Sequence, residues 1–290
     1  MRIGLIGVGI VGEATKQIFQ KAHEIFPYDK YKEPFNSEKH IDDLAEFAEV
    51  IFVCVPTPMK PSGEIDCSAI HNSLNLLDKK TKEKARNQNK IIMVIRSTVV
   101  PGSTDNFEKQ YPFQFAFNPE FLREKHALED MENQSRIIIG TNNLETYSKI
   151  EAVYKPLLPN AKYISVDIKT AEMIKYSANV ILTGQIAIAN EIYQICQRLG
   201  VNYDTIKKTI LLDERIGTNI DIPGPDGNLG FGGKCFPKDL NALIYLAREN
   251  KYRPYLLEEI WRLNEKVRKD KNWMNIDGAT SEKNYQDSGN

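Results

Sequence analysis

The chain has 290 residues, of which 38 are basic and 39 acidic, so its formal net charge at pH 7 is -1. This balance excludes the strongly basic surface that attracts nucleic acid or anionic lipid, and the length suits one large or two ordinary domains. No apolar run approaches the ~18 residues of a membrane span, and the N-terminal MRIGLIGVG lacks the charged region and cleavage site of a signal peptide.

The first part of the chain alternates short apolar runs with helical patterns. We expect strands at 2–7, 23–29, 50–56, 90–97, 113–118, 136–140 and 162–166, with helices at 13–22 and 42–49. Continuous β-branched runs separated by helices are typical of a parallel sheet that is covered on both faces. The predicted fold class is therefore α/β, with a doubly wound, Rossmann-like sheet in a domain of residues 1–167.

A GxGxxG motif lies between the first strand and the first helix, with glycines at 7, 9 and 12. Gly7 would allow the turn, Gly9 would let the backbone approach a pyrophosphate, and Gly12 would let the helix pack on the strand. The helix N-terminus would offer free N–H groups to the anion. Asp29 follows the motif by about seventeen residues, where an acid accepts from a ribose hydroxyl and favours NAD over NADP. The alternative is a set of turn-forming glycines beside a surface carboxylate.

Apolar residues recur at helical spacing for about thirty residues from Ile168. This run is longer than a typical globular helix and suits a spine between domains or subunits. Further helices are expected at 203–214, 238–250 and 254–270, so residues 168–272 should form a mainly helical domain. The polar residues 273–290 are expected to be disordered.

The cysteines lie far apart in the sequence, at 54, 67, 196 and 235. Their spacing argues against a zinc site and favours a reducing compartment, so we expect a cytoplasmic protein without a metal. Cys54 and Cys196 lie in apolar runs and are interpreted as small packing residues.

The stretch GFGGKCFPKDL, residues 230–240, places Cys235 between a glycine-rich turn and the start of a helix. A thiol is a strong nucleophile only as a thiolate, which a nearby cation or a helix N-terminus favours. Lys238 lies three residues further along the chain, so Cys235 is a candidate nucleophile. The alternative is a buried cysteine that packs like a small hydrophobic residue.

Six motifs occur in the order found in the UDP-glucose/GDP-mannose 6-dehydrogenases, which the chain resembles from residue 1 to about residue 268. They are GxGxxG at 7–12, VPTP at 55–58, STVVPGST at 97–104, NPEFLRE at 118–124, KYSAN at 175–179 and GFGGKCFPKDL at 230–240. The resemblance implies oxidation of a nucleotide-sugar primary alcohol to a carboxylate, with two NAD reduced. UDP-glucose is favoured over GDP-mannose as the substrate. The resemblance also implies a homodimer built on the long helix, residues 168–199.

The resemblance assigns the covalent chemistry to the helical domain. Cys235 would capture the aldehyde as a thiohemiacetal, whose oxidation gives a thioester that water hydrolyses. Lys175 and Asn179 are four residues apart on one helix face and would jointly hold an oxyanion. Asp239 would activate the hydrolytic water.

The remaining residues implied by the resemblance surround the cofactor and the substrate. Glu120 would contact the substrate and move a proton through water, and Thr98 would position water. The implied cofactor-binding residues are Gly7, Val8, Gly9, Ile10, Val11, Gly12, Asp29, Pro56, Thr57, Thr98, Glu124 and Lys238. The implied substrate-binding residues are Glu120, Phe121, Leu122, Lys175, Asn179, Arg215, Phe231 and Gly232.

The sequence departs from the family pattern at three points. Lys234 precedes the cysteine where the family has a small residue, and a second cation there would favour the thiolate. Only Lys30 and Lys32 represent the basic residue that follows the ribose acid. Family members also continue into a second nucleotide-fold domain of about 100 or more residues. That domain closes over the nucleotide part of the substrate. We expect it to be lacking here, so that the substrate is held by fewer contacts, a second polypeptide supplies the domain, or activity has been lost.

Two other functions stay open. One is a single-step β-hydroxyacid-type dehydrogenase, related to 3-hydroxyisobutyrate or 6-phosphogluconate dehydrogenases. Those enzymes share the Lys-x-x-x-Asn pair but have no cysteine loop. The other is a non-catalytic or degenerate NAD-binding protein.

Overall fold

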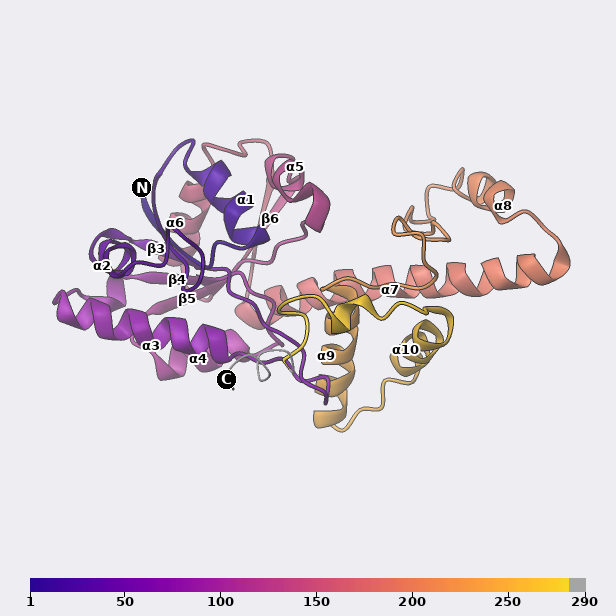
Figure 1. Cartoon of the computed structure of the whole chain (residues 1–290). Helices are drawn as coiled ribbons and strands as arrows, with labels where there is room; N and C mark the ends of the chain where they lie inside the picture. The colour runs from indigo at the N-terminus through magenta and orange to yellow at the C-terminus, as the bar shows by residue number, and fades with distance from the viewer. Residues whose placement is uncertain (282–290) are drawn as a thin grey trace. The chain divides into compact units, whose positions relative to one another are not determined.

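The structure is a computed structural model and describes residues 1–281 (Figure 1). The chain divides into two units, the first made of residues 1–57 and 67–175 and the second of residues 58–66 and the chain from 176 onward. The division therefore lies between residues 175 and 176, inside the long helix. The sequence pattern instead predicts a boundary between residues 167 and 168, just before this helix. The loop 58–66 belongs to the second unit although it lies within the first in sequence.

In the part of the chain that the structure describes, seven strands form one sheet in the first unit. They are β1 (Arg2–Ile6), β2 (Glu24–Tyr28), β3 (Val50–Val53), β4 (Ile92–Ile95), β5 (Gln114–Phe117), β6 (Arg136–Gly140) and β7 (Lys162–Val166). Their order is β2-β1-β3-β4-β5-β6-β7, and the strands from β2 to β5 pair in parallel. β6 pairs antiparallel with β5 at Phe117 and Gly140 and then parallel with β7. All the predicted strands are confirmed, but the sheet is mostly rather than wholly parallel.

Helices cover both faces of this sheet (Figure 1). On one face pack α2 (Glu38–Phe47), α3 (Ser68–Glu83), α4 (Ser103–Gln110) and the first turns of α7. On the other face pack α1 (Ile10–Phe19), α5 (Ala127–Glu132) and α6 (Leu144–Tyr154). Alternate side chains of β3 enter the two cores, with Ile51 and Val53 on one side and Val50 and Phe52 on the other. Burial on both faces explains the continuous apolar runs of the sequence.

The helices of this first unit differ from the sequence expectations. α1 begins at Ile10 and α2 at Glu38, three and four residues before the predicted starts at 13 and 42. The sequence patterns did not predict α3, α4, α5 or α6. Short 3-10 turns η1 (Gln88–Lys90) and η2 (Glu124–His126) complete the unit.

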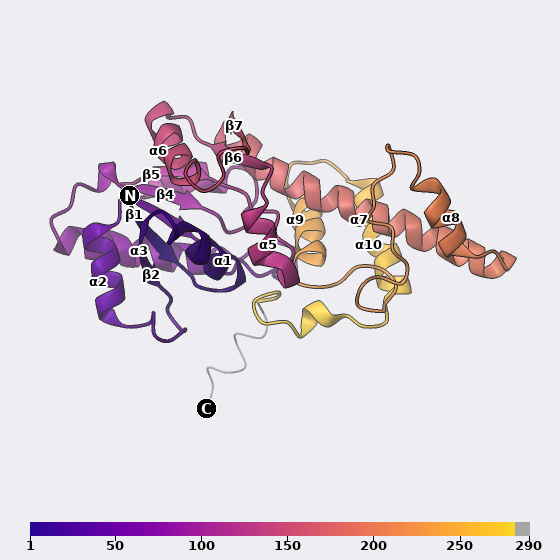
Figure 2. The ribbon, with the colours of Figure 1, turned by 90° about the horizontal axis from the view of Figure 1, so that it is seen from above.

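The second unit is helical, as predicted. α7 (Ile168–Leu199) continues from the first unit, and α8 (Tyr203–Ile210), α9 (Phe236–Glu249) and α10 (Tyr255–Val267) follow. α9 and α10 lie side by side (Figure 2) and share an apolar cluster that includes Leu240, Ile244 and Ile260. Within residues 1–281, no helix combines the length and the apolarity that a membrane crossing requires.

The segment after α10 differs from the disordered tail that the sequence suggests. η3 (Asn272–Met274) carries Trp273, which is 3% exposed and packs against Trp261 with ring centroids 5.6 Å apart. Met59 and Thr280 form a β-bridge. An aromatic anchor and main-chain pairing thus order residues 273–281, while residues 282–290 lie outside the described residues.

Candidate functional site

The glycine motif forms the turn between β1 and α1. A Cβ atom on Gly7 would lie 2.8 Å from the main-chain carbonyl of Cys54, and one on Gly12 would lie 2.0 Å from the carbonyl oxygen of Gly7. A Cβ atom on Gly9, the N-cap of α1, would meet nothing within 4 Å. Packing therefore requires Gly7 and Gly12, whereas Gly9 leaves open room at a helix N-terminus, where an anion is favoured.

Asp29 follows β2 and turns back onto the glycine motif. Its Oδ2 accepts a hydrogen bond from the N–H of Val8 at 2.7 Å, and its Oδ1 accepts from the N–H groups of Tyr31 and Lys32 at 2.9 and 3.0 Å. Lys32 Nζ in turn donates to the carbonyl oxygen of Val8 at 2.9 Å. The carboxylate is held beside the turn and, with two lone pairs on each oxygen, can still accept from a ribose hydroxyl. These residues fit a dinucleotide that has no ribose phosphate.

Three more predicted residues follow the carboxyl ends of adjacent parallel strands. Thr57 follows β3, Thr98 follows β4 and Glu120 follows β5. The Thr57 hydroxyl donates to the carbonyl oxygen of Thr98 at 2.8 Å. Ligands of open α/β sheets bind outside this edge, so the first unit gathers its predicted site residues where the fold favours a ligand. Of the remaining predicted residues, Ile10, Pro56 and Glu124 have exposed side chains.

Glu120 and Lys175 form a buried ion pair in the first unit. Lys175 Nζ donates to Glu120 Oε1 at 2.9 Å and to the Glu120 carbonyl oxygen at 2.7 Å, and the N–H of Leu122 donates to Oε2 at 2.8 Å. Burial alone would raise the pKa of Glu120, but Lys175, the Leu122 N–H and Arg96 together hold this pKa below its ordinary value. Glu120 is therefore an anion at neutral pH that can orient a water molecule. Lys175 also lies over the ring of Phe121, 5.5 Å from its centroid.

Cys235 occupies the N-cap position of α9 and is exposed. Pro237 lies in the first turn, and the carbonyl oxygen of Cys235 accepts from the N–H of Asp239 at 2.8 Å. A thiolate at this position has the favourable interaction with the helix dipole. By contrast, burial raises the pKa of Cys54 to about 12, and Cys196 is buried. The structure therefore gives Cys235 the surroundings that suit a nucleophile and the other two those of packing residues.

The structure brings three predicted residues of the second unit together, namely Asn179, Lys238 and Asp239. Asn179 Nδ2 donates to Asp239 Oδ2, and Lys238 Nζ donates to Asp239 Oδ1, both at 2.5 Å. All three side chains are buried. Since Nδ2 carries two hydrogens, Asn179 can hold the carboxylate with one and donate the other to a ligand.

The glycine loop before the cysteine is held by asparagines that sequence reasoning did not identify. Asn264 of α10 accepts from the N–H of Phe231 at 2.7 Å and donates to its carbonyl oxygen at 3.0 Å. Asn190 of α7 accepts from the N–H of Gly230 at 2.9 Å. A Cβ atom on Gly230 would lie 2.3 Å from Asn264 Oδ1, so the clamp requires a glycine there.

A third asparagine holds the next part of this loop. Asn272 Oδ1 accepts from the N–H of Gly233 at 3.0 Å. Gly232 leaves room for Arg268, because a Cβ atom there would lie 2.4 Å from Arg268 Nη2. Arg268 is itself buried and pairs with Asp226 at 2.5 Å. The loop that leads to Cys235 is thus fixed through its main chain from several directions.

The signal that could have identified Asn264 is its position on α10. It lies four residues after the buried Ile260, on the face of the helix that faces the core. A polar residue on the apolar face of an amphipathic helix needs a hydrogen-bonding partner, which here is the main chain of the glycine loop.

Arg215 is a predicted substrate residue of the second unit that makes no hydrogen bond to this loop within residues 1–281. Its side chain is 89% exposed and pairs with Asp213 at 2.5 Å. Its hydrogen bonds within residues 1–281 all go to Asp213, two residues away, and none reaches Phe231 or Gly232.

Comparison with known proteins identifies two matching domain models. The NAD binding domain of the UDP-glucose/GDP-mannose dehydrogenase family matches residues 29–158, and the central domain of the same family matches residues 169–266. Together these matches include most of the chain.

Individual relatives agree with the domain models. The chain is 39% identical over 222 residues to a UDP-glucose 6-dehydrogenase of Rickettsia bellii, a match that includes 74% of this chain and 49% of that protein. It is 34% identical over 229 residues to a UDP-glucose 6-dehydrogenase of Bacillus subtilis, with 76% and 47% covered. The chain thus spans about half the length of the curated relatives it matches.

Solved structures show the same relationship. A UDP-glucose dehydrogenase of Pyrobaculum islandicum superposes with a TM-score of 0.80 at 28% identity, covering 91% of this chain and 68% of that one. A GDP-mannose dehydrogenase of Pseudomonas aeruginosa superposes with a TM-score of 0.66, also at 28% identity, covering 92% and 69%.

Proposed function

The chain belongs to the UDP-glucose/GDP-mannose dehydrogenase family, and on that premise we propose that it oxidises the primary alcohol of a nucleotide sugar to a carboxylate with NAD. UDP-glucose is the substrate we favour, because the relatives with 30–40% identity described above carry that name. The observation that carries the proposal is the exposed Cys235 thiol at the start of α9, four residues before the buried Asp239.

The first unit would hold the cofactor. The room at Gly9 would admit the pyrophosphate to the N-terminus of α1, and Asp29 would accept from a ribose hydroxyl. NAD bound there would supply the hydride acceptor for each of the two oxidations, with a second NAD replacing the first after its reduction. Glu120 and Thr98, which follow adjacent strands, would hold the reacting end of the substrate and a water molecule.

The helical unit, together with Lys175 of the first unit, would supply the covalent chemistry. After the first oxidation, the Cys235 thiolate would add to the aldehyde carbon, forming a C–S bond and placing negative charge on the oxygen. Lys175 and Asn179 would stabilise this oxyanion before it is protonated. The second oxidation would remove the hydride from the same carbon and the proton from its hydroxyl, leaving a thioester.

Hydrolysis would complete the cycle. Water, oriented by Asp239, would attack the thioester carbon, the C–S bond would break, and the Cys235 thiolate would leave as the carboxylate forms. The hydrogen bonds from Asn179 and Lys238 support this role because they fix both carboxylate oxygens of Asp239.

Stoichiometry tests the proposal. The chain is incubated with NAD and UDP-glucose, GDP-mannose or UDP-N-acetylmannosamine, and both NADH and sugar product are measured. We expect two NADH per UDP-glucose consumed, and loss of carboxylate formation in Cys235→Ala and Cys235→Ser. One NADH per substrate would support the single-step dehydrogenase instead. Binding of UDP-glucose and NAD without turnover would support the non-catalytic alternative.

An exposed stripe on α7 supports a homodimer as part of the proposed function. Ile181, Ile188, Ile192, Ile195 and Leu199 are 37–71% exposed. They recur at intervals of seven, four, three and four residues, so they share one face of the helix. An apolar face of this kind, which the described residues 1–281 leave exposed, suits the same helix of a second copy.

A further inference from the structure

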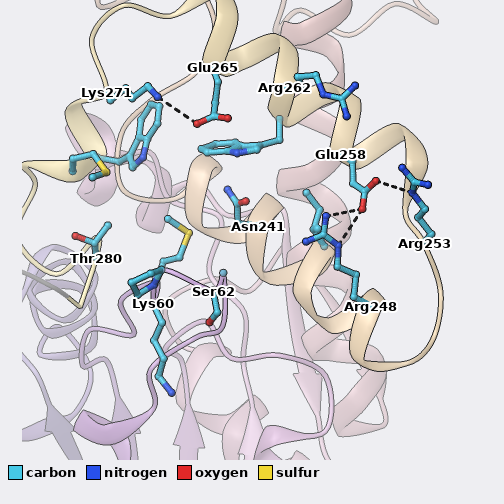
Figure 3. Close-up of a pocket in the computed structure, with 17 residues that line it drawn as sticks. Lys60, Ser62, Asn241, Arg248, Arg253, Glu258, Arg262, Glu265, Lys271 and Thr280 are labelled. Atoms are coloured by element: carbon cyan, nitrogen blue, oxygen red, sulfur yellow. Dashed lines mark hydrogen bonds and ion pairs between the residues drawn. The ribbon is translucent and has the colours of Figure 1, made fainter.

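A cavity of about 1000 Å³ lies within the second unit, between facing sides of α9 and α10 (Figure 3). Residues 241–248 of α9 and 258–265 of α10 form its long walls, and residues 59–63 and 271–274 close it. This volume is at the upper end of the range of about 300–1000 Å³ in which small-molecule sites fall. Cys235, Lys238 and Asp239 do not line it, so the cavity is separate from the thiol site proposed above.

Both tryptophans of the chain line this cavity. Trp273 is 3% exposed and Trp261 is half-buried, and their ring centroids are 5.6 Å apart at an interplanar angle of 59°. Met59, Ile244 and Met274 add apolar surface to the same walls. Indole faces and thioethers of this kind bind planar rings by stacking and dispersion.

One end of the cavity carries an excess of positive charge. Glu258 accepts from Arg248 Nε and Nη2 at 3.0 and 2.6 Å and from Arg253 Nε at 3.2 Å, so two guanidinium groups share one carboxylate (Figure 3). Within residues 1–281, the hydrogen bonds of Arg253 use only Nε, and its side chain is 63% exposed. Its two Nη groups can therefore donate to a ligand.

Arg262 adds a further cation to the rim near this end. It pairs with Glu259, which does not line the cavity, and both side chains are more than half exposed. Exposed pairs of this kind contribute about 0–1 kcal/mol, so a ligand anion can compete for the guanidinium. The opposite end is balanced, because Lys271 pairs with Glu265 at 3.3 Å (Figure 3).

We propose that this cavity is a nucleotide-binding site, distinct from the dinucleotide turn of the first unit. The base stacks on the half-buried ring of Trp261, against which the buried Trp273 packs, and the phosphate lies at the arginine end. A guanidinium offers a planar fork of donors that matches phosphate oxygens, which favours a phosphate over a carboxylate or an uncharged sugar. Lys60 takes no part, because it pairs with Glu64 at 2.9 Å and points away from the ring walls (Figure 3).

The tryptophans provide a direct test, since all the indole fluorescence of the chain comes from this cavity. The full chain is titrated with UMP, AMP, uridine and inorganic phosphate, with excitation at the long-wavelength edge of indole absorption to avoid the bases. We expect a saturable change with both nucleotides. Binding of uridine or phosphate alone should be at least about tenfold weaker, because each lacks one half of the ligand.

Two arginine variants locate the phosphate. Arg253→Ala and Arg262→Ala each remove a charge-assisted hydrogen bond and should weaken UMP binding about tenfold. Both arginines are exposed, so urea unfolding should show an intact fold. Lys266→Ala is the matched control, because it removes an exposed cation of α10 that does not line the cavity, and binding should be unchanged.

A variant of the first unit separates this site from the proposed cofactor site. Gly9→Val fills the room in the dinucleotide turn and should leave the fluorescence titration unchanged. The proposal is overturned if UMP binding measured by calorimetry leaves tryptophan emission unchanged, survives both arginine substitutions or is lost in Gly9→Val. Absence of nucleotide binding would overturn it too. No outcome depends on turnover, so failure of the proposed dehydrogenase function would be seen separately.

Discussion

The Lys175 ammonium donates to both the carboxylate and the main-chain carbonyl of Glu120, at 2.9 and 2.7 Å, and both side chains are buried. Removing one partner of such a pair leaves an uncompensated buried charge. We expect Lys175→Met to lower the free energy of unfolding at neutral pH by about 3–5 kcal/mol, measured by urea titration. Lys169→Met, an exposed lysine of the same helix, is the control and should change it by less than about 0.5 kcal/mol.

The same pair predicts a pH dependence. The pKa of Glu120 lies below its ordinary value of 4.5 in the folded chain, because Lys175 and its other partners outweigh the effect of burial. The stabilisation by Glu120 is therefore fully present above pH 4.5 and is lost as the pH falls through the lower folded value. The stability difference between the wild type and Lys175→Met should shrink over that acidic range. A difference that stays constant would contradict the assignment.

Glu172 should give the opposite pH dependence. It accepts from the N–H groups of Gly102 and Thr104 at 2.5 and 2.9 Å, but burial outweighs these bonds and raises its pKa to about 7. The folded chain then binds the proton more tightly than the unfolded chain, so stability falls as the pH rises from 4.5 to about 7. We expect Glu172→Gln to remove this loss, which is on the order of 3 kcal/mol.

Urea titrations at about pH 5 and about pH 8 measure this slope. Glu191→Gln is the control, since Glu191 is an exposed carboxylate of the same helix and its removal should leave the slope as in the wild type. Equal slopes in the wild type and Glu172→Gln would show that Glu172 does not titrate in this range.

The strands were predictable because most of them are buried on both faces. Residues of β3 enter both cores, so VIFV is a continuous apolar run. Such a run lacks the alternation of apolar and polar residues that marks a surface helix. The helices α3 to α6 were missed for different reasons. α4 and α5 have eight and six residues, too few to establish a helical period. α3 buries only five of its sixteen residues, and α6 only four of its eleven. The direction of β6 could not be read, since a strand has the same alternation in either direction.

The site was predictable only as far as motifs mark it. The residues around Asp239 lie in KYSAN and in the cysteine loop, and the structure brings them together. The asparagines that clamp the loop lie outside any motif, and their partners are main-chain atoms far away in sequence. Arg215 also lies outside the six motifs, and its exposed side chain pairs with Asp213 two residues away, so its assignment to the substrate stays a prediction.

The glycines at 9 and 12 should have separable effects. In Gly12→Ala the new Cβ would lie 2.0 Å from the Gly7 carbonyl oxygen, so we expect a loss of stability of about 3 kcal/mol or more. In Gly9→Ala the new Cβ meets nothing within 4 Å, so stability should change by less than about 1 kcal/mol. NAD affinity, measured by calorimetry, should nevertheless fall in Gly9→Ala. Unchanged affinity would show that the pyrophosphate does not approach Gly9.

Gly230 and Gly227 form a matched pair for the asparagine clamp. Both have positive φ, +70° and +77°, so alanine adds backbone strain of about 1 kcal/mol at either position. At Gly227 the new Cβ meets nothing, whereas at Gly230 it displaces the Asn264 carboxamide. Gly230→Ala should therefore cost about 1–3 kcal/mol more than Gly227→Ala in urea unfolding.

The alkylation rate of Cys235, followed by peptide mass spectrometry, separates positioning from stability. We expect Gly230→Ala and Asn264→Ala to change this rate and Gly227→Ala to leave it unchanged. Equal rates in all four proteins would show that the clamp supports the fold without positioning the thiol.

The apolar stripe of α7 gives the last prediction. Ile188 is 64% exposed in the middle of the stripe, so a glutamate there should leave the free energy of unfolding of the isolated chain unchanged. It would, however, place a charge in the proposed dimer interface. We expect the wild type to be a dimer by light scattering and Ile188→Glu to be a monomer with an unchanged fold by circular dichroism. Leu212→Glu is the control, because Leu212 is 83% exposed outside the stripe, and the dimer should persist. A monomeric wild type, or a dimer that survives Ile188→Glu, would exclude this face as the interface.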